Sequence, residues 1–324
     1  MSEGETDVGA WIGGTIGVII GLILLGWLIR RISQGKQFTK DVRAENKVVI
    51  VTGSNAGIGK ETVLDLASRG ATVYMACRDM QKCDEARLHI IEKTGNSKVY
   101  ARKLDLGSLE SVRNFVKEFL EEESRLDILI NNAGVMNLPR WETKDGFEMQ
   151  LGVNHMGHFL LTNLLLDTLK ASAPSRIVVV ASDVHKYGVI RKDDLNSEKS
   201  YNKYKAYFQS KLANVLFVKE LSKRLEGTGV TVNSLHPGVV QTELMRHQSI
   251  VGKLMIPFRI FQKNPKSGAQ TQLTVALDPD LEKVSGKYFD NCKIKEEGSA
   301  AKDDEMAKWL WNISVEWTKS DQRF

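Results

Sequence analysis

The sequence of 324 residues predicts a doubly wound α/β domain with a parallel sheet, preceded by one transmembrane helix. Two observations support this fold class. Residues 8–29 carry no charge, and from residue 47 onward short runs rich in β-branched residues alternate with helix-length amphipathic segments. Apolar residues make up 42% of the chain and charged residues 26%, which is typical of a globular protein.

The uncharged segment at residues 8–29 is long enough to cross a bilayer. As a helix it would extend about 33 Å, against a hydrocarbon core of about 30 Å. A cleaved signal peptide is the alternative, but the preceding residues are acidic and no small-residue cleavage site follows. Basic side chains follow the span in the linker at residues 30–44, and none precede it. The positive-inside rule therefore predicts a luminal terminus at residues 1–7 and a cytosolic remainder, as expected for the endoplasmic reticulum membrane.

Charge and cysteine usage exclude several partners. The net charge is only +5 and the body of the chain has no long basic tract, so we do not expect nucleic-acid binding. Three cysteines without regular spacing suggest neither a disulfide framework nor a zinc cluster. Gly13, Gly17 and Gly21 form a ridge of small residues that would allow a homodimer, although glycine is common in membrane helices in any case.

From about residue 45 to residue 324 the pattern is that of one continuous domain. The expected strands are residues 47–52, 72–77, 99–104, 126–130, 176–181, 230–235 and, last in the chain, 285–289. The expected helical segments after the second strand are residues 79–93, 108–123, 147–170, 203–226 and 300–317. Strands separated by helices make right-handed crossovers, and these give a parallel sheet with both faces covered.

A glycine-rich segment, Thr52-Gly53-Ser54-Asn55-Ala56-Gly57-Ile58-Gly59-Lys60, follows the first strand. Glycine lets the chain turn sharply and approach a pyrophosphate, while the next helix offers free N–H groups to the phosphate. We therefore expect a dinucleotide to contact Gly53, Ser54, Asn55, Gly57, Ile58 and Gly59.

Two further positions carry acid-base chemistry. Tyr207 and Lys211 are four residues apart on an expected helix, so both side chains can point into one cleft. A nearby ammonium favours phenolate and lowers the pKa of a tyrosine from about 10. Ser182 follows the expected strand at 176–181, at the sheet edge where ligands bind, and its hydroxyl can hydrogen-bond a substrate oxygen.

Five motifs, in this order, resemble those of the short-chain dehydrogenase/reductase family: the glycine-rich segment, Asn131-Asn-Ala-Gly134, Ser182, Tyr207-Phe-Gln-Ser-Lys211 and Pro237-Gly238. Three segments contain residues that look like those of the membrane-anchored retinol dehydrogenase branch of this family. They are Ala76-Cys-Arg-Asp79, Asn154-His-Met-Gly-His-Phe159 and Leu235-His-Pro-Gly238. The resemblance covers nearly the whole chain and implies a single Rossmann-type domain.

The resemblance also implies residue roles. Tyr207 would donate the proton, Ser182 would steady the oxygen, and Lys211 would hold the ribose hydroxyls and tune the tyrosine. Asn154 would hold a water that extends a proton relay from the lysine. The remaining cofactor contacts implied by the family are Asp105 at the adenine, Asn131 beneath the adenosine, and Pro237, Val240 and Thr242 around the nicotinamide.

The end of the second expected strand bears on cofactor choice. An NAD-dependent enzyme usually places an acidic side chain there, but this chain has Cys77, followed by Arg78, which can pair with a 2′-phosphate. Asp79 is more simply the N-cap of the next helix. The sequence therefore predicts NADP(H).

The substrate is expected to be a lipophilic alcohol or carbonyl compound that reaches the enzyme from the bilayer. The segment at about residues 241–263 is apolar and basic, and in the family this segment covers the substrate. The same composition would equally suit an amphipathic segment that packs on its own domain. Near the carboxyl terminus, Trp309 and Trp311 could pack on the core or contact the membrane. His155 and His158 lack a third ligand, so no metal is expected.

The expected function is therefore interconversion of retinol and retinaldehyde, or of similar lipophilic alcohols and aldehydes, mainly as a reductase. A hydroxysteroid or other lipid carbonyl reductase is the near alternative. A catalytically idle, membrane-anchored nucleotide-binding scaffold is a further alternative, which the intact set of four catalytic residues disfavours.

Overall fold

A computed structural model of the chain describes residues 15–16, 20–21, 24–241 and 262–320. Its strands, in chain order, are β1 (Val48–Thr52), β2 (Thr72–Cys77), β3 (Val99–Lys103), β4 (Ile128–Asn131), β5 (Ser175–Val180), β6 (Val230–His236), β7 (Tyr288–Asp290) and β8 (Lys293–Lys295). They form one sheet in the order β3-β2-β1-β4-β5-β6-β7-β8. The strands from β1 to β7 pair in parallel, and β8 pairs antiparallel with β7.

This topology reverses direction beside β1. The chain moves outward from β1 to β2 and β3, then returns to place β4 on the other side of β1. The loops after β1 and β4 therefore diverge and leave a crevice at the carboxyl ends of the strands, where open α/β sheets bind ligands.

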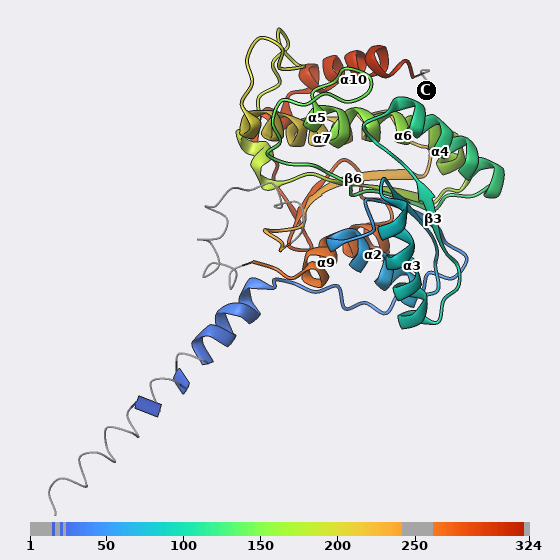
Figure 1. The fold of residues 1–324 in the computed structure, drawn as a ribbon, viewed down its shortest axis with the longest axis vertical. Coiled ribbons are helices and arrows are strands. Elements are labelled where there is room, and N and C mark those ends of the chain that lie inside the picture. Colours follow the sequence, from blue (N-terminus) through green and yellow to red (C-terminus); the bar gives the residue numbers. More distant parts are fainter. Residues whose placement is uncertain (1–14, 17–19, 22–23, 242–261, 321–324) are drawn as a thin grey trace, which may run out of the picture.

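Helices cover both faces of the sheet (Figure 1). One face carries α2 (Gly57–Ser68), α3 (Met80–Thr94) and α9 (Pro265–Leu277). The other carries α4 (Leu109–Glu122), α6 (Gly157–Ala171) and α7 (Lys203–Arg224), with α10 (Asp304–Thr318) packed outside α7. Short 3-10 turns are η2 (Asp183–Tyr187), η5 (Pro279–Leu281) and η6 (Ser299–Lys302).

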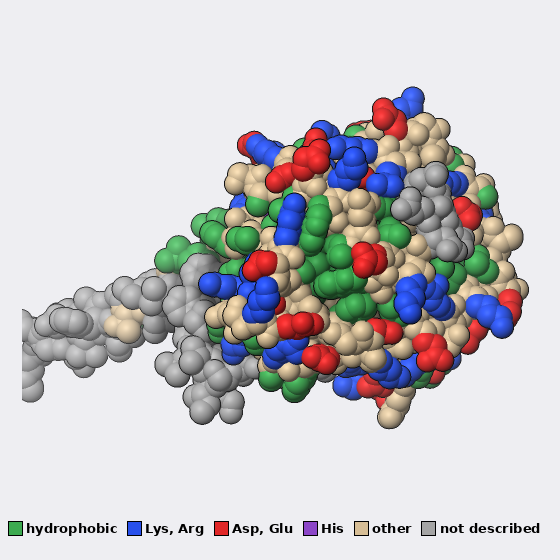
Figure 2. All heavy atoms as spheres, turned by 90° about the horizontal axis from the view of Figure 1, so that it is seen from above, with side chains coloured by type: hydrophobic (Ala, Val, Ile, Leu, Met, Phe, Trp, Pro, Cys, Tyr) green, Lys and Arg blue, Asp and Glu red, His purple; other side chains and the backbone are tan. Residues whose placement is uncertain are grey.

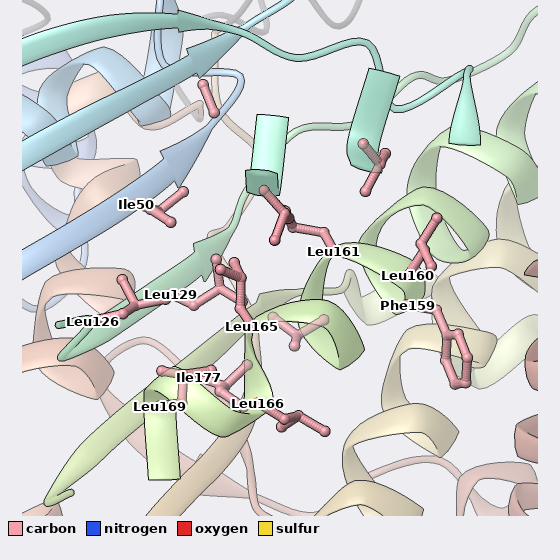
Figure 3. Close-up of a cluster of buried hydrophobic side chains, with 14 of the residues drawn as sticks. Ile50, Leu126, Leu129, Phe159, Leu160, Leu161, Leu165, Leu166, Leu169 and Ile177 are labelled. Atoms are coloured by element: carbon pink, nitrogen blue, oxygen red, sulfur yellow. The ribbon is translucent and has the colours of Figure 1, made fainter. Parts of the chain in front are cut away.

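The core consists of two layers separated by the sheet. Ile50 of β1 packs in the layer that contains α6, while its neighbours Val49 and Val51 pack against the opposite helices, because successive strand residues point to opposite faces. Figure 3 shows Leu129 and Ile177 of the sheet beside the side chains of α6. The predicted doubly wound parallel sheet is confirmed.

Several helix boundaries follow from capping. The Asp79 side chain accepts a hydrogen bond from the Lys82 N–H at 3.2 Å, which confirms the predicted N-cap of α3. Ser108 caps α4 in the same way through the Ser111 N–H. The prediction of a single helix at residues 147–170 is wrong in detail. The structure has three consecutive helical elements there: α5 (Met149–Leu151), a π-helical turn η1 (Gly152–Met156) and α6.

Two elements near the carboxyl terminus were not expected. Helix α9 is buried along its whole length from Ser267 to Leu277, so it lacks the amphipathic period that marks a surface helix. Its only sequence signals are the Asn264 N-cap and Pro265 at its start. Strand β8 is three residues long and fully exposed, and it corrects the expectation that the strand at 285–289 is the last.

Cys77 and Cys83 form a disulfide in the structure, with Cα atoms 6.2 Å apart. This pairing corrects the expectation drawn from the cysteine count. Cys77 ends β2, and Cys83 lies in the first turns of α3, whose start packs against that strand, so six residues suffice to bring the two side chains together.

The described residues 24–33 form a helix that projects from the domain beside α9 (Figure 1). Within the described parts of the chain, no helix combines the length and the apolar character needed to cross a bilayer. Much of the expected span at 8–29, including Gly13 and Gly17, and most of the segment at 241–263 lie outside the described residues.

On the face above α10, basic and acidic side chains alternate around gathered apolar side chains (Figure 2).

Candidate active site

A cleft of about 530 Å³ opens at the carboxyl edge of the sheet, at the reversal point between β1 and β4. It is lined by the glycine-rich loop, by the ends of β2 and β5, by the segment after β4, and by residues of α7. The topology therefore brings the predicted motifs, which span residues 53–240, into one continuous cavity.

The glycine-rich loop has the shape that a pyrophosphate needs. Gly53 and Gly57 have positive φ values of 63° and 57°, which favour glycine. A Cβ atom at Gly59 would lie 2.5 Å from the Gly53 carbonyl oxygen, so the loop folds back on the first turn of α2. Ala56 caps α2 without any side-chain hydrogen bond, which leaves the first N–H groups of the helix available to phosphate oxygens.

Two of the expected cofactor contacts lie outside the cleft lining. The buried Ser54 hydroxyl donates to the Val51 carbonyl at 3.0 Å and so fixes the loop from below. The buried Asn131 amide donates to the Thr162 hydroxyl of α6 at 2.8 Å. Asn132 lines the cleft instead, and its amide donates to the Thr52 carbonyl at 2.8 Å. Only its place in the Asn131-Asn-Ala-Gly134 motif could have indicated this role in positioning the loop.

The end of β2 forms the far end of the cleft. Arg78 is exposed and lines the cavity together with Lys82 and Asp105, whereas Cys77 is buried. The Asp79 carboxylate, next to Arg78 in the chain, is used as the cap of α3, and the Asp105 carboxylate lines the same part of the cleft. Basic side chains from two consecutive elements therefore face the position where a dinucleotide would carry its ribose substituent.

Ser182, Tyr207 and Lys211 meet at the centre of the cleft. Ser182 follows β5 in an extended conformation, and its hydroxyl makes no capping hydrogen bond with η2. The Lys211 ammonium lies 5.7 Å from the centroid of the Tyr207 ring and donates to the Val180 carbonyl at 3.0 Å. One turn of α7 separates the phenol from the ammonium, as the sequence spacing predicts.

Burial dominates the electrostatics of this pair. It raises the pKa of Tyr207 to about 12, although a hydrogen bond with the Ser182 side chain acts in the opposite direction and lowers this pKa. Burial also lowers the pKa of Lys211 to about 8. The pKa of the tyrosine is thus raised, opposite to the direction expected from a neighbouring lysine alone, because the desolvation of a buried phenolate outweighs that attraction.

Asn154 sits in the π-helical turn η1 and faces the same region. Its amide nitrogen donates to Ser210 at 2.9 Å, and its side-chain oxygen accepts from the Val135 N–H at 2.8 Å. A Cβ atom at Gly134 would lie 3.3 Å from the Asn154 oxygen and 3.6 Å from the Lys211 nitrogen, so this glycine keeps the space between them open. Asn154 does not line the cleft directly. Single π-helical turns inside helices are frequent at functional sites.

The loop after β6 closes the cleft. Pro237, Gly238 and Val240 line it beside His236, and Thr242 lies outside the described residues. Met136, Leu138 and Trp141, from the segment after β4, add apolar surface to the wall.

The histidines near the site are neutral structural groups. Burial lowers the pKa of His155 to about 3 and that of His158 to about 4. The His185 ring interacts with the Ser182 carbonyl at 2.7 Å, and its other nitrogen accepts from the Gly298 N–H at 2.9 Å. His185 therefore ties the loop that carries Ser182 to the chain after β8, a contact that sequence position alone did not reveal. Among the described residues, no group of three or more potential ligands could hold a metal ion.

Comparison with known proteins agrees with this geometry. Residues 47–250 match the family model described as short chain dehydrogenase. The chain belongs to the short-chain dehydrogenase family. This family consists of oxidoreductases that use a nicotinamide cofactor, and the glycine loop, the free first turn of α2 and the cleft fit such a dinucleotide.

Relatives within the short-chain dehydrogenases cover most of the chain. It is 56% identical to retinol dehydrogenase 13 of Homo sapiens over 276 residues, which is 83% of each protein. It is 53% identical to retinol dehydrogenase 12 of Homo sapiens, covering 89% of this chain and 91% of that protein. Among solved structures, an uncharacterised protein from Mycobacterium paratuberculosis superposes with a TM-score of 0.72 at 35% identity, covering 89% of this chain and all of that one.

Proposed function

We propose that the protein is an NADP(H)-dependent oxidoreductase that interconverts retinol and retinaldehyde, or similar lipophilic alcohols and aldehydes, mainly as a reductase. The observation that carries this proposal is a single cleft with Ser182, Tyr207 and Lys211 at its centre and Arg78 at one end. The retinoid substrate class is supported by the names of the relatives that are more than half identical to this chain.

A nicotinamide cofactor held in the cleft would supply the hydride that reduces the substrate carbon, or would accept it in the reverse direction. Ser182 donates a hydrogen bond to the carbonyl oxygen and places it beside the Tyr207 hydroxyl. Tyr207, whose pKa is raised by burial, remains protonated at neutral pH and donates its proton to that oxygen. Lys211 would hold the ribose hydroxyls of the cofactor, and its ammonium stabilises the phenolate that remains. Asn154 would keep a water beside Lys211 for return of the proton.

The preference for NADP(H) follows from charge at the end of β2. Arg78 and Lys82 attract a 2′-phosphate, and the buried Cys77 supplies no carboxylate to repel it. Arg78→Ala should raise the KM for NADPH roughly 10- to 150-fold, the effect of losing a charge-assisted hydrogen bond of ~1.5–3 kcal/mol. The KM for NADH is the internal control and should hardly change. Higher activity of the native enzyme with NADH would refute the cofactor assignment.

We further propose that residues 8–29 anchor the enzyme in a membrane, with the catalytic domain in the cytosol. The uncharged segment and the basic residues after it support this topology. Protease added outside sealed microsomes should then digest the catalytic domain. Protection of that domain would place it in the lumen and reverse the orientation.

The substrate class is tested with the purified full chain, NADPH, and a panel of retinaldehyde, a ketosteroid and a long alkanal. We expect kcat/KM to be highest for retinaldehyde. A clear preference for the ketosteroid would favour the alternative of a hydroxysteroid reductase, and no turnover of any carbonyl compound would indicate an idle scaffold.

A further inference from the structure

His158 is a polar residue in an apolar part of α6, and the proposed reaction does not use it. Its apolar neighbours at residues 159–161 are fully buried, and only 2% of His158 is exposed. Burying a polar ring costs free energy unless its nitrogen atoms are hydrogen-bonded. Here Nε2 lies 2.8 Å from the Thr52 hydroxyl oxygen, and Nδ1 lies 3.2 Å from the Asn154 carbonyl oxygen. The ring therefore bridges the end of β1 and the π-helical turn η1.

The two partners of His158 fix the position of each hydrogen in this bridge. A carbonyl oxygen can only accept, so Nδ1 carries the hydrogen and donates to Asn154. In a neutral imidazole Nε2 is then the acceptor, and it takes the hydrogen of the Thr52 hydroxyl. The contact of that hydroxyl with the Ile130 carbonyl is longer, at 3.5 Å. Burial lowers the pKa of His158 to about 4, so the ring is neutral at pH 7, as this pattern requires.

The Thr52 hydroxyl joins the two walls of the crevice beside β1. Its oxygen accepts from the N–H groups of Asn132 and Ala133, both at 2.9 Å. The next residue of the chain, Gly53, packs so closely on this segment that a Cβ atom there would lie 2.9 Å from the Ala133 Cα. A hydroxyl rotates to suit its partners, and both lone pairs of Thr52 can face these N–H groups when its hydrogen has an acceptor elsewhere. His158 supplies that acceptor.

The other end of the bridge holds the turn that carries Asn154. The side-chain oxygen of Asn154 accepts from the Val135 N–H at 2.8 Å, and its amide donates to Ser210 at 2.9 Å. The Ser210 hydroxyl in turn donates to the Tyr207 carbonyl at 2.8 Å. A shift of the turn would therefore be transmitted to the helix that carries Tyr207.

We propose that His158 is a positioning residue that sets the glycine-rich loop against the segment after β4 and holds the Asn154 turn in place. The inference rests on the proposed function, in which a nicotinamide dinucleotide binds in the cleft. The Nε2 contact acts on cofactor affinity, because Thr52 immediately precedes the glycine-rich loop. The Nδ1 contact acts on turnover, because Asn154 and Lys211 lie on either side of the space that Gly134 keeps open.

Two substitutions separate these contacts, since the side-chain amide of glutamine reaches the position of Nε2 and that of asparagine reaches the position of Nδ1. His158→Gln should leave the Kd for NADPH nearly unchanged and lower kcat for retinaldehyde roughly 10-fold, the effect of one lost buried hydrogen bond. His158→Asn should raise the Kd for NADPH roughly 10-fold and leave kcat at saturating NADPH nearly unchanged. Fluorescence titration and steady-state kinetics of the full chain in detergent measure both quantities.

His155→Gln is the matched control. His155 is likewise 2% exposed, but it lies in η1 and its Nε2 contacts the Ser314 hydroxyl of the outer helix α10 at 2.9 Å. This variant should lower Tm about as much as the His158 variants do and leave the Kd for NADPH unchanged. Effects of equal size in the two His158 variants, or an equal rise in Kd for His155→Gln, would show a merely structural role. A native chain that binds NADH but not NADPH refutes the proposed cofactor alone, because the same comparison can then be made with NADH.

The native chain offers a second measurement that does not depend on the folding of any variant. The NMR chemical shifts of the His158 ring nitrogens report which of them carries the hydrogen. We expect the Nδ1–H form at pH 7, with and without NADPH. The opposite form would direct three N–H groups at the Thr52 oxygen and leave the Asn154 carbonyl without this donor, so its detection would overturn the inference.

Discussion

Replacing Lys211 by methionine should abolish activity and yet stabilise the fold. The buried ammonium titrates at about 8 in the folded protein, against 10.5 for an ordinary lysine. This difference corresponds to about 3 kcal/mol of lost stability at neutral pH. The hydrogen bond to the Val180 carbonyl returns about 1 kcal/mol. That carbonyl keeps a second donor in Asn214 at 3.2 Å, so Lys211→Met leaves it satisfied. The expected net gain is about 2 kcal/mol.

The gain should depend on pH in a definite direction. Below pH 8 the lysine is protonated in both states, and the cost of burying the charge is fully present. Between pH 8 and 10.5 the unfolded chain binds a proton that the folded chain lacks, so the stability of the native protein rises with pH. Above that range lysine is neutral in both states, and the advantage of methionine disappears.

Thermal unfolding of the full chain in detergent, followed by circular dichroism, measures this effect. At pH 7 the Tm of Lys211→Met should rise by about 4 °C, and at pH 10 the difference should be near zero. Lys205→Met, an exposed position on the same helix, is the control and should shift Tm little at either pH. A Tm at or below that of the native protein at pH 7 would show that the fold does not bear the cost of burying this charge.

Three further outcomes are expected. Tyr207→Phe should lower kcat at least ~10²-fold with little change in Tm or in NADPH affinity, and more than a few per cent of residual activity would reject its role as proton donor. Gly59→Ala should weaken NADPH binding measured by fluorescence, because the new Cβ would meet the Gly53 carbonyl oxygen at 2.5 Å; unchanged affinity would contradict the pyrophosphate cradle. Finally, Tm should fall as pH drops from 6.5 to 5. In the folded protein His155 and His158 have pKa values of about 3 and about 4, so both rings stay neutral over this range. In the unfolded chain both rings become protonated, which favours unfolding. A flat profile over that range would contradict their burial.

Local patterns along the chain were enough to predict the sheet and the edge at which the site lies. Short β-branched runs separated by helix-length segments favour parallel strands with crossovers, and all the expected strands from 47–52 to 230–235 are present. Four of the five motifs follow strand ends, so their meeting at the carboxyl edge could be predicted without knowledge of packing, whereas the fifth lies on α7. The spacing of Tyr207 and Lys211 and the cap at Asp79 are likewise local features, which depend only on helix geometry.

Which side chains of each motif face the cleft depends on packing between distant parts of the chain. Asn131 and Asn132 are adjacent, but the direction of the last pleat of β4 sends the first toward α6 and the second toward the glycine loop. The helix α9 escaped prediction because burial on all sides removes its period. Burial also set the pKa of Tyr207, since desolvation depends on everything packed around the phenol and not on the lysine four residues away.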